Sequence, residues 1–161
     1  MRKSLEAVTL AFLTFLIQIT WQAFHGVDPL PDKVPTHFDA AGNANAWGPP
    51  GTLWILPVIA VVLYLLVTVI SLVPTGVKKA ARLSPESKAR LDALTKQMIT
   101  WLKLELVCLF ACLQWFILKA VREGSGGISR AVMPVFLFAV FVNVAWHLAA
   151  IFRSIRTASN Q

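Results

Sequence analysis

Four long apolar runs dominate this chain, and polar connections separate them. Crossing a hydrocarbon core of about 30 Å takes roughly 20 helical residues. Four runs reach this length, at residues 5–24, 52–73, 99–121 and 131–152. The pattern therefore predicts an all-α integral membrane protein in which residues 1–161 form a single four-span domain.

The connection at residues 25–51 concentrates rigid, ionisable and turn-forming residues. Three of its prolines, Pro29, Pro31 and Pro35, fix φ and disfavour helix in the residues before them. We therefore expect extended backbone up to a turn at Gly42. This predicts an ordered proline-rich loop between the first two spans.

The connection at residues 74–98 has a different character. Ser84-Pro85-Glu86 combines an N-cap residue, a first-turn proline and an acidic residue favoured by the helix dipole. Apolar and charged residues then alternate with roughly helical spacing. The segment is either an amphipathic helix on the membrane surface that continues into the third span or a solvated helical linker, and the sequence favours neither.

Charge orients the predicted spans. The chain is 57% hydrophobic, which excludes an ordinary soluble domain, and its net charge is +7. Lys and Arg gather before the first span, in residues 74–98 and after the fourth span, and such a bias marks the cytoplasmic side. Both termini are therefore predicted to be cytoplasmic, with the loop at residues 25–51 on the other side. The same bias explains the positive charge, so we expect a lipid bilayer and not nucleic acid as a partner.

Cys108 and Cys112 lie one helical turn apart in the third predicted span. Neither His nor further Cys stands at ligand spacing, so packing explains them better than a metal or redox pair. No cofactor is expected.

One motif in the first connection resembles a known family. Leu30-Pro31-Asp32-Lys33-Val34-Pro35-Thr36-His37-Phe38-Asp39-Ala40-Ala41-Gly42, followed by Trp47-Gly48 and a span, resembles the pattern Leu-Pro-x-x-Ile/Val-Pro-x-His-Phe/Trp-x-x-x-Gly. This pattern is typical of the domain-of-unknown-function family 1648, which also forms the N-terminal part of SdpI-type toxin-immunity membrane proteins of bacteria. The chain departs from the commonest form at Asn43-Ala44-Asn45 and at Pro49-Pro50-Gly51. The resemblance implies a bacterial cytoplasmic membrane protein.

The loop supplies the first candidate site, for binding a partner. Its proposed contact residues are Pro31, Pro35, His37, Phe38, Asp39 and Gly42. In extended backbone His37 and Asp39 point the same way, and an imidazole with a carboxylate can hold a metal or handle a proton. The alternative, which the sequence favours, is that His37 bonds the loop backbone and the acids cap turns.

Polar residues inside the spans supply the second candidate site. Glu105 and His147 lie at similar depth, with Asn143 one turn deeper. We interpret them as interhelical hydrogen bonding, with proton or ion handling as the alternative, unless Lys103 neutralises Glu105 instead.

A further polar group lies on one face of the first span. Gln18, Gln22 and His25 share this face just beneath the loop. They predict either interhelical hydrogen bonds or a polar floor under the loop.

These features favour a recognition protein, immunity-like or an accessory subunit, that binds a peptide or a membrane protein through the outer loop. The alternative is a metal-dependent or proton-coupled activity, as enzyme or carrier, at His37 and Asp39 or at Glu105 and His147. No Ser-His-Asp order, His-Glu-x-x-His helix or Gly-rich phosphate loop occurs, so we assign no catalytic residue. Whether the loop binds a metal, and whether the chain forms a homo-oligomer, stay open at this point.

Overall fold

The computed structural model describes residues 2–72, 84–124 and 129–159. Its helices are α1 (Arg2–His25), α2 (Ile55–Leu72), α3 (Pro85–Glu123) and α4 (Val132–Ser159), and the short 3-10 helix η1 (Pro50–Trp54) leads into α2. All four α-helices are long and apolar enough to cross a membrane when η1 is counted as part of α2. The predicted number of membrane-length helices is therefore confirmed.

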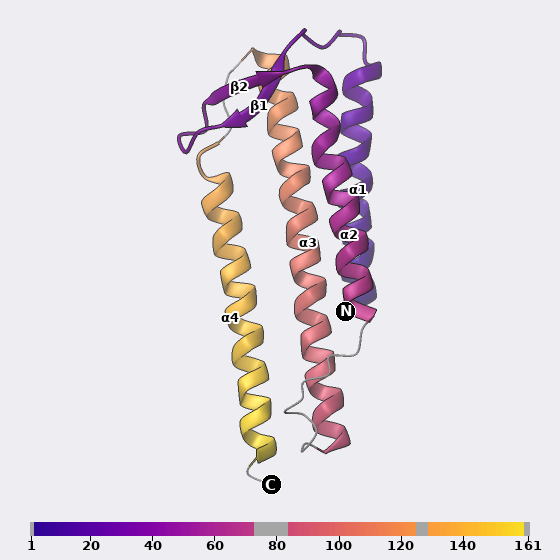
Figure 1. The fold of residues 1–161 in the computed structure, drawn as a ribbon, viewed down its shortest axis with the longest axis vertical. Coiled ribbons are helices and arrows are strands. Elements are labelled where there is room, and N and C mark those ends of the chain that lie inside the picture. Colours follow the sequence, from indigo (N-terminus) through magenta and orange to yellow (C-terminus); the bar gives the residue numbers. More distant parts are fainter. Residues whose placement is uncertain (1, 73–83, 125–128, 160–161) are drawn as a thin grey trace.

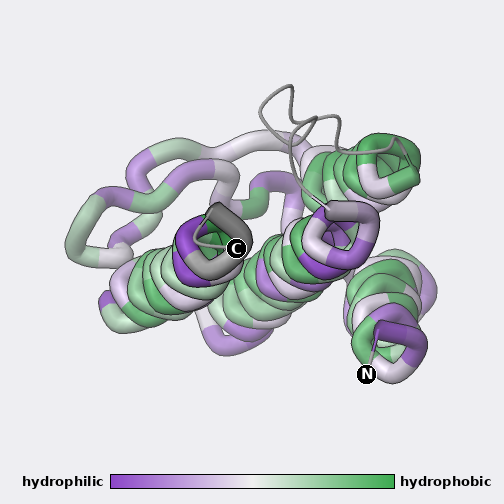
Figure 2. The backbone as a smooth tube through the Cα atoms, turned by 90° about the horizontal axis from the view of Figure 1, so that it is seen from below, coloured by the Kyte–Doolittle hydropathy of each residue, from purple (hydrophilic) through white to green (hydrophobic). Residues whose placement is uncertain are grey.

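Helix α3 is the centre of the bundle. Figures 1 and 2 show it between α4 on one side and α1 with α2 on the other. Its 39 residues span about 58 Å at 1.5 Å per residue. It therefore extends well beyond the ends of α1 and α2 (Figure 1).

The start of α3 is the one that the sequence predicts. The Ser84 hydroxyl accepts a hydrogen bond from the Ser87 N–H at 3.3 Å, and Pro85 occupies the first turn. The segment up to residue 98 then continues in line with the rest of the helix (Figure 1), unlike a helix that lies flat on a membrane. At the other end, Gly124 adopts φ 63°, a left-handed conformation that ends helices without steric cost.

The first connection contains a β-hairpin that the all-α prediction does not include. Strand β1 (Val34–Phe38) pairs antiparallel with β2 (Ala44–Gly48), with irregular register around His37. The sequence predicts the extended backbone of β1 from its prolines. It does not predict β2, because Ala, Asn and Gly have low strand propensity.

Two apolar clusters hold the bundle together. The middle cluster joins α1, α2 and α3 through Leu13, Leu16, Ala60, Val107 and Ala111. The second lies at the end of the bundle that carries the hairpin, here called the hairpin end, and contains Ile19, Ala23, Val34, Leu53 and Leu118. Because Val34 belongs to β1 and is fully buried, this second cluster docks the hairpin on the helices.

Candidate functional site

The turn of the hairpin is built around Asp39 and Gly42. One Asp39 carboxylate oxygen accepts a hydrogen bond from the Asn43 N–H at 2.9 Å, and the other accepts from Asn43 Nδ2 at 3.3 Å. The Gly42 N–H donates to the Asp39 carbonyl at 2.9 Å, and Gly42 has φ 84°. The Asn43 N–H holds the pKa of Asp39 below its usual value of 3.8. Asp39 thus caps the turn, as the structural interpretation predicts.

His37 braces the two strands. Its Nδ1 is hydrogen-bonded to Oδ1 of Asn45 on the opposite strand. The sequence predicts that His37 bonds the loop backbone. In the structure its partner is the Asn45 side chain. Asn43 and Asn45, where the chain departs from the commonest form of the family motif, are thus the partners of Asp39 and His37.

The other predicted contact residues differ in accessibility. Pro31 is exposed, Phe38 is half-buried, and Pro35 and Gly42 are buried. Trp47 on β2, which the prediction leaves out, is 54% exposed. Within the described ranges no group of three or more His, Cys, Asp and Glu side chains lies close enough to hold a metal ion.

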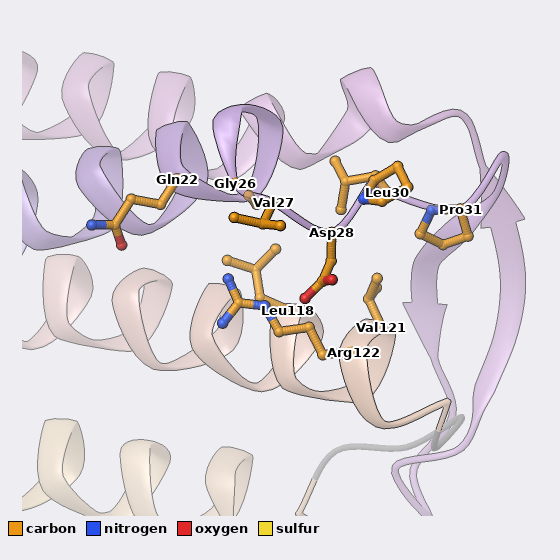
Figure 3. Close-up of a pocket in the computed structure, with 11 residues that line it drawn as sticks. Gln22, Gly26, Val27, Asp28, Leu30, Pro31, Leu118, Val121 and Arg122 are labelled. Atoms are coloured by element: carbon orange, nitrogen blue, oxygen red, sulfur yellow. The ribbon is translucent and has the colours of Figure 1, made fainter.

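A cavity of about 310 Å³ opens beside the hairpin, at the end of α1. Its walls come from the last turn of α1, residues 26–31 and the last turns of α3 (Figure 3). Gln22, Asp28 and Arg122 are its hydrogen-bonding or charged side chains. Of Gln18, Gln22 and His25, for which the sequence predicts interhelical hydrogen bonds or a polar floor under the loop, Gln22 is the one that lines this cavity.

The comparisons with known proteins agree with the loop motif. Residues 9–61 match the model of the family described as Domain of unknown function (DUF1648). No curated protein and no solved structure matches the chain. The resemblance predicted from the motif is confirmed, and the DUF1648 region contains most of α1, the loop, the hairpin and the start of α2.

Outside the DUF1648 region, a polar contact joins α3 and α4, and it is made by Glu105 with Asn143 where the sequence pairs Glu105 with His147. Asn143 Nδ2 donates to Glu105 Oε2 at 3.1 Å, and His147 Nδ1 donates to the Asn143 backbone carbonyl at 2.9 Å. His147 is only 5% exposed. The structure therefore brings all three residues together, with Asn143 as the bridge, while proton handling by them stays a prediction.

Lys103 does not neutralise Glu105, which was the predicted alternative. Its Nζ donates to both carboxylate oxygens of Glu6, at 2.6 and 2.7 Å, and to Thr68 Oγ1 at 3.1 Å. The same ammonium lies 4.5 Å from the centre of the Tyr64 ring, whose hydroxyl donates to Glu6 at 3.3 Å. This cluster joins α1, α2 and α3.

The sequence analysis missed the pair of Glu6 and Lys103, although a signal was present. Glu6 is the single charged residue of the run at residues 5–24, and Lys103 is a cation within the run at residues 99–121. Both stand a few residues from the end that the charge bias assigns to the cytoplasm. Opposite charges at similar depth in two spans predict a contact.

The predicted interhelical role of Gln18 is taken by other residues. Gln18 is exposed, whereas the buried Gln114 of α3 donates from Nε2 to Thr20 Oγ1 at 3.0 Å and to the Leu53 carbonyl at 3.1 Å. His25 is also exposed and stacks on Trp21. Gln114 therefore ties α1 and η1 to α3, directly beneath the hairpin.

Proposed function

We propose that this chain is a small multi-pass protein of a bacterial cytoplasmic membrane that recognises a peptide or a membrane-protein partner through its hairpin. Both termini then lie in the cytoplasm, and the hairpin faces the other side. The Lys and Arg asymmetry supports this orientation, and the four apolar helices suggest the membrane. An immunity-like or accessory role rests on the family resemblance.

The observation that carries the proposal is the free edge of β2. Strand β1 packs against η1 and α3, whereas β2 packs on β1 and is paired with no further described strand. All five residues of β2 are exposed or half-buried, and none of them is charged or proline. Unprotected edge strands accept additional strands, and extended peptides bind many proteins in this way.

Side chains beside this edge can select the partner. The exposed Trp47 offers a large apolar surface, and His37 offers its second ring nitrogen. The hairpin cannot swing freely, because Val34 is buried in the bundle and Arg130 Nε donates to the Ala41 carbonyl at 3.1 Å. A preorganised edge reduces the entropy lost on binding.

The test is affinity purification of the tagged chain from native membranes. The stoichiometry of any retained peptide or protein is measured, and then its affinity for the chain. Exchanging Trp47→Ala together with His37→Ala should weaken partner binding by about tenfold or more, since a lost charge-assisted hydrogen bond alone costs about 1.5–3 kcal/mol. Membrane insertion should stay intact, because neither residue belongs to a helix.

The matched control is Asp32→Asn with Lys33→Gln, which changes two exposed residues of the same loop outside the hairpin. The control should bind as the wild type does. Wild-type affinity in the Trp47 and His37 variant, or an equal loss in the control, would show that the hairpin is not the recognition element.

A further inference from the structure

Two opposite charges face the cavity at the end of α1 without meeting. Figure 3 shows the Asp28 carboxylate pointing from the loop toward α3, which carries Arg122. Neither side chain has a hydrogen bond or an ion pair with another described residue. A carboxylate and a guanidinium on the walls of one cavity complement a ligand that carries both a cation and an anion.

A second cavity adjoins the first between α1 and α3, and one of its walls is apolar; this wall is called the apolar groove below. This second cavity, of about 280 Å³, shares Gln22, Leu118 and Arg122 with the first and adds Ile19 and Trp115. Its other lining residues, Lys119 and Glu123, are within 3.8 Å of each other and form an ion pair. The first cavity, called the chamber below, thus carries the charges of Asp28 and Arg122. The second has an apolar wall of Ile19, Trp115 and Leu118, with the Lys119–Glu123 pair at its border, so the two together suit an amphiphile.

In a bilayer, the tryptophans at the hairpin end would place the chamber at the depth of lipid headgroups. It is built where α1 and α3 end. Trp21 precedes Gln22 on α1, Trp54 stacks on Phe24 of the same helix, and Trp115 lines the second cavity. Tryptophan side chains are enriched at membrane–water interfaces. A lipid headgroup can therefore enter the chamber from the bilayer while its chain stays in the apolar groove.

We propose that this site binds a phospholipid whose headgroup carries a primary ammonium, of the phosphatidylethanolamine type. Arg122 binds the phosphate, because a guanidinium matches phosphate oxygens with paired N–H donors. Asp28 accepts hydrogen bonds from the ammonium, and one acyl chain lies along Ile19, Trp115 and Leu118. At about 310 Å³ the chamber is at the small end of ligand pockets, which suits a headgroup. This inference does not depend on partner recognition by β2.

The experiment is native mass spectrometry of the purified full chain with lipids of identical acyl chains. Phosphatidylethanolamine, its singly, doubly and triply N-methylated forms and phosphatidylglycerol are compared. Methylation removes the N–H donors one at a time, so affinity for the wild-type chain should fall stepwise, by about tenfold over the series. This arm needs no variant.

Two single variants test which residue binds the ammonium and which binds the phosphate of the headgroup. Asp28→Asn should abolish the preference for the unmethylated lipid, and Arg122→Gln should weaken binding of every phospholipid tested. The control Asp32→Asn with Lys33→Gln lines neither cavity and should behave as the wild type does. Circular dichroism checks that the helices are retained, which we expect because Asp28 and Arg122 are exposed.

Several results would overturn the proposal. Equal affinity for the methylated and unmethylated lipids would show that Asp28 does not bind the ammonium. The same conclusion would follow if Asp28→Asn kept the wild-type preference for the unmethylated lipid. Soluble phosphoethanolamine that binds as tightly as the lipid shows that the apolar groove takes no part. Displacement of the lipid by a short zwitterionic peptide, with no preference among headgroups, would reassign the chamber to peptides.

Discussion

Lys103 shows how a single charged residue can be accommodated inside an apolar bundle. The side chain is 2% exposed, yet its ammonium is bonded to a carboxylate and a hydroxyl and lies over an aromatic ring. A buried charge is tolerated when its partners replace the lost water. The pair of Lys103 and Glu6 therefore links α1 to α3 within the apolar bundle.

Removing the cation should destabilise the protein strongly. We expect Lys103→Met to lower the free energy of unfolding by about 1–3 kcal/mol, because the Glu6 carboxylate, whose side chain is 32% exposed, would lose its cation. Adding Glu6→Gln should recover part of the loss, and the double-mutant cycle gives the coupling energy. Denaturant unfolding in detergent measures all three variants.

Lys119→Met is the matched control for this prediction. Lys119 pairs with Glu123 at 3.8 Å on the surface of the same helix, and both side chains are 54% exposed. Exposed pairs of this kind contribute about 0–1 kcal/mol. A loss in the control equal to that in Lys103→Met would mean that the buried pair does not stabilise the bundle.

At the scale of elements, the hairpin depends on one backbone conformation at its turn. Gly42 has φ 84°, where a side chain is strained, and its N–H closes the turn on the Asp39 carbonyl. Val34 is buried at the base of the same hairpin. A distorted turn should therefore loosen the hairpin edge while the helices remain.

Exchanging Gly42→Val should destabilise the hairpin by roughly 1–3 kcal/mol. Limited proteolysis between the strands and the folded yield in detergent measure the effect, and both should change more than in His37→Ala. Gly51→Ala is the control, because a Cβ at Gly51 would meet no atom within 4 Å. Equal behaviour of Gly42→Val and His37→Ala would contradict this account of the turn.

At the scale of the whole molecule, the four helices form an open layered bundle around α3 (Figure 2). Many large apolar side chains of α4 face away from the protein, among them Phe138, Phe141 and Trp146, which are 69–71% exposed. Lipid chains would cover such surfaces in a bilayer. The bundle thus has two chemically distinct ends, with the hairpin at one and the projecting start of α3 at the other.

The proposed orientation predicts opposite labelling of these two ends. In a background with Cys108→Ala and Cys112→Ala, a cysteine in place of Asn45 should react with an impermeant reagent in intact cells. A cysteine in place of Lys88 should react only after the cells are opened, because the Lys and Arg bias assigns this segment to the cytoplasm. Labelling at position 88 in intact cells would overturn the orientation.

Features that depend on neighbours along the chain could be predicted from the sequence. The four helices follow from the length of the apolar runs, the start of α3 from Ser84 and Pro85, and the turn from Gly42. Helix length, capping and turn conformation are decided within a few residues, so local chemistry determines them. The family motif is local in the same sense.

Only the tertiary structure decided which distant groups meet. Lys103 pairs with Glu6 and not with Glu105. Val34 docks the hairpin against α3. Asp28 and Arg122 line the same cavity. These contacts depend on how far each helix is rotated and shifted against its neighbours. Packing of apolar side chains sets that rotation and shift, and it involves residues far apart in sequence, so no local pattern encodes the result.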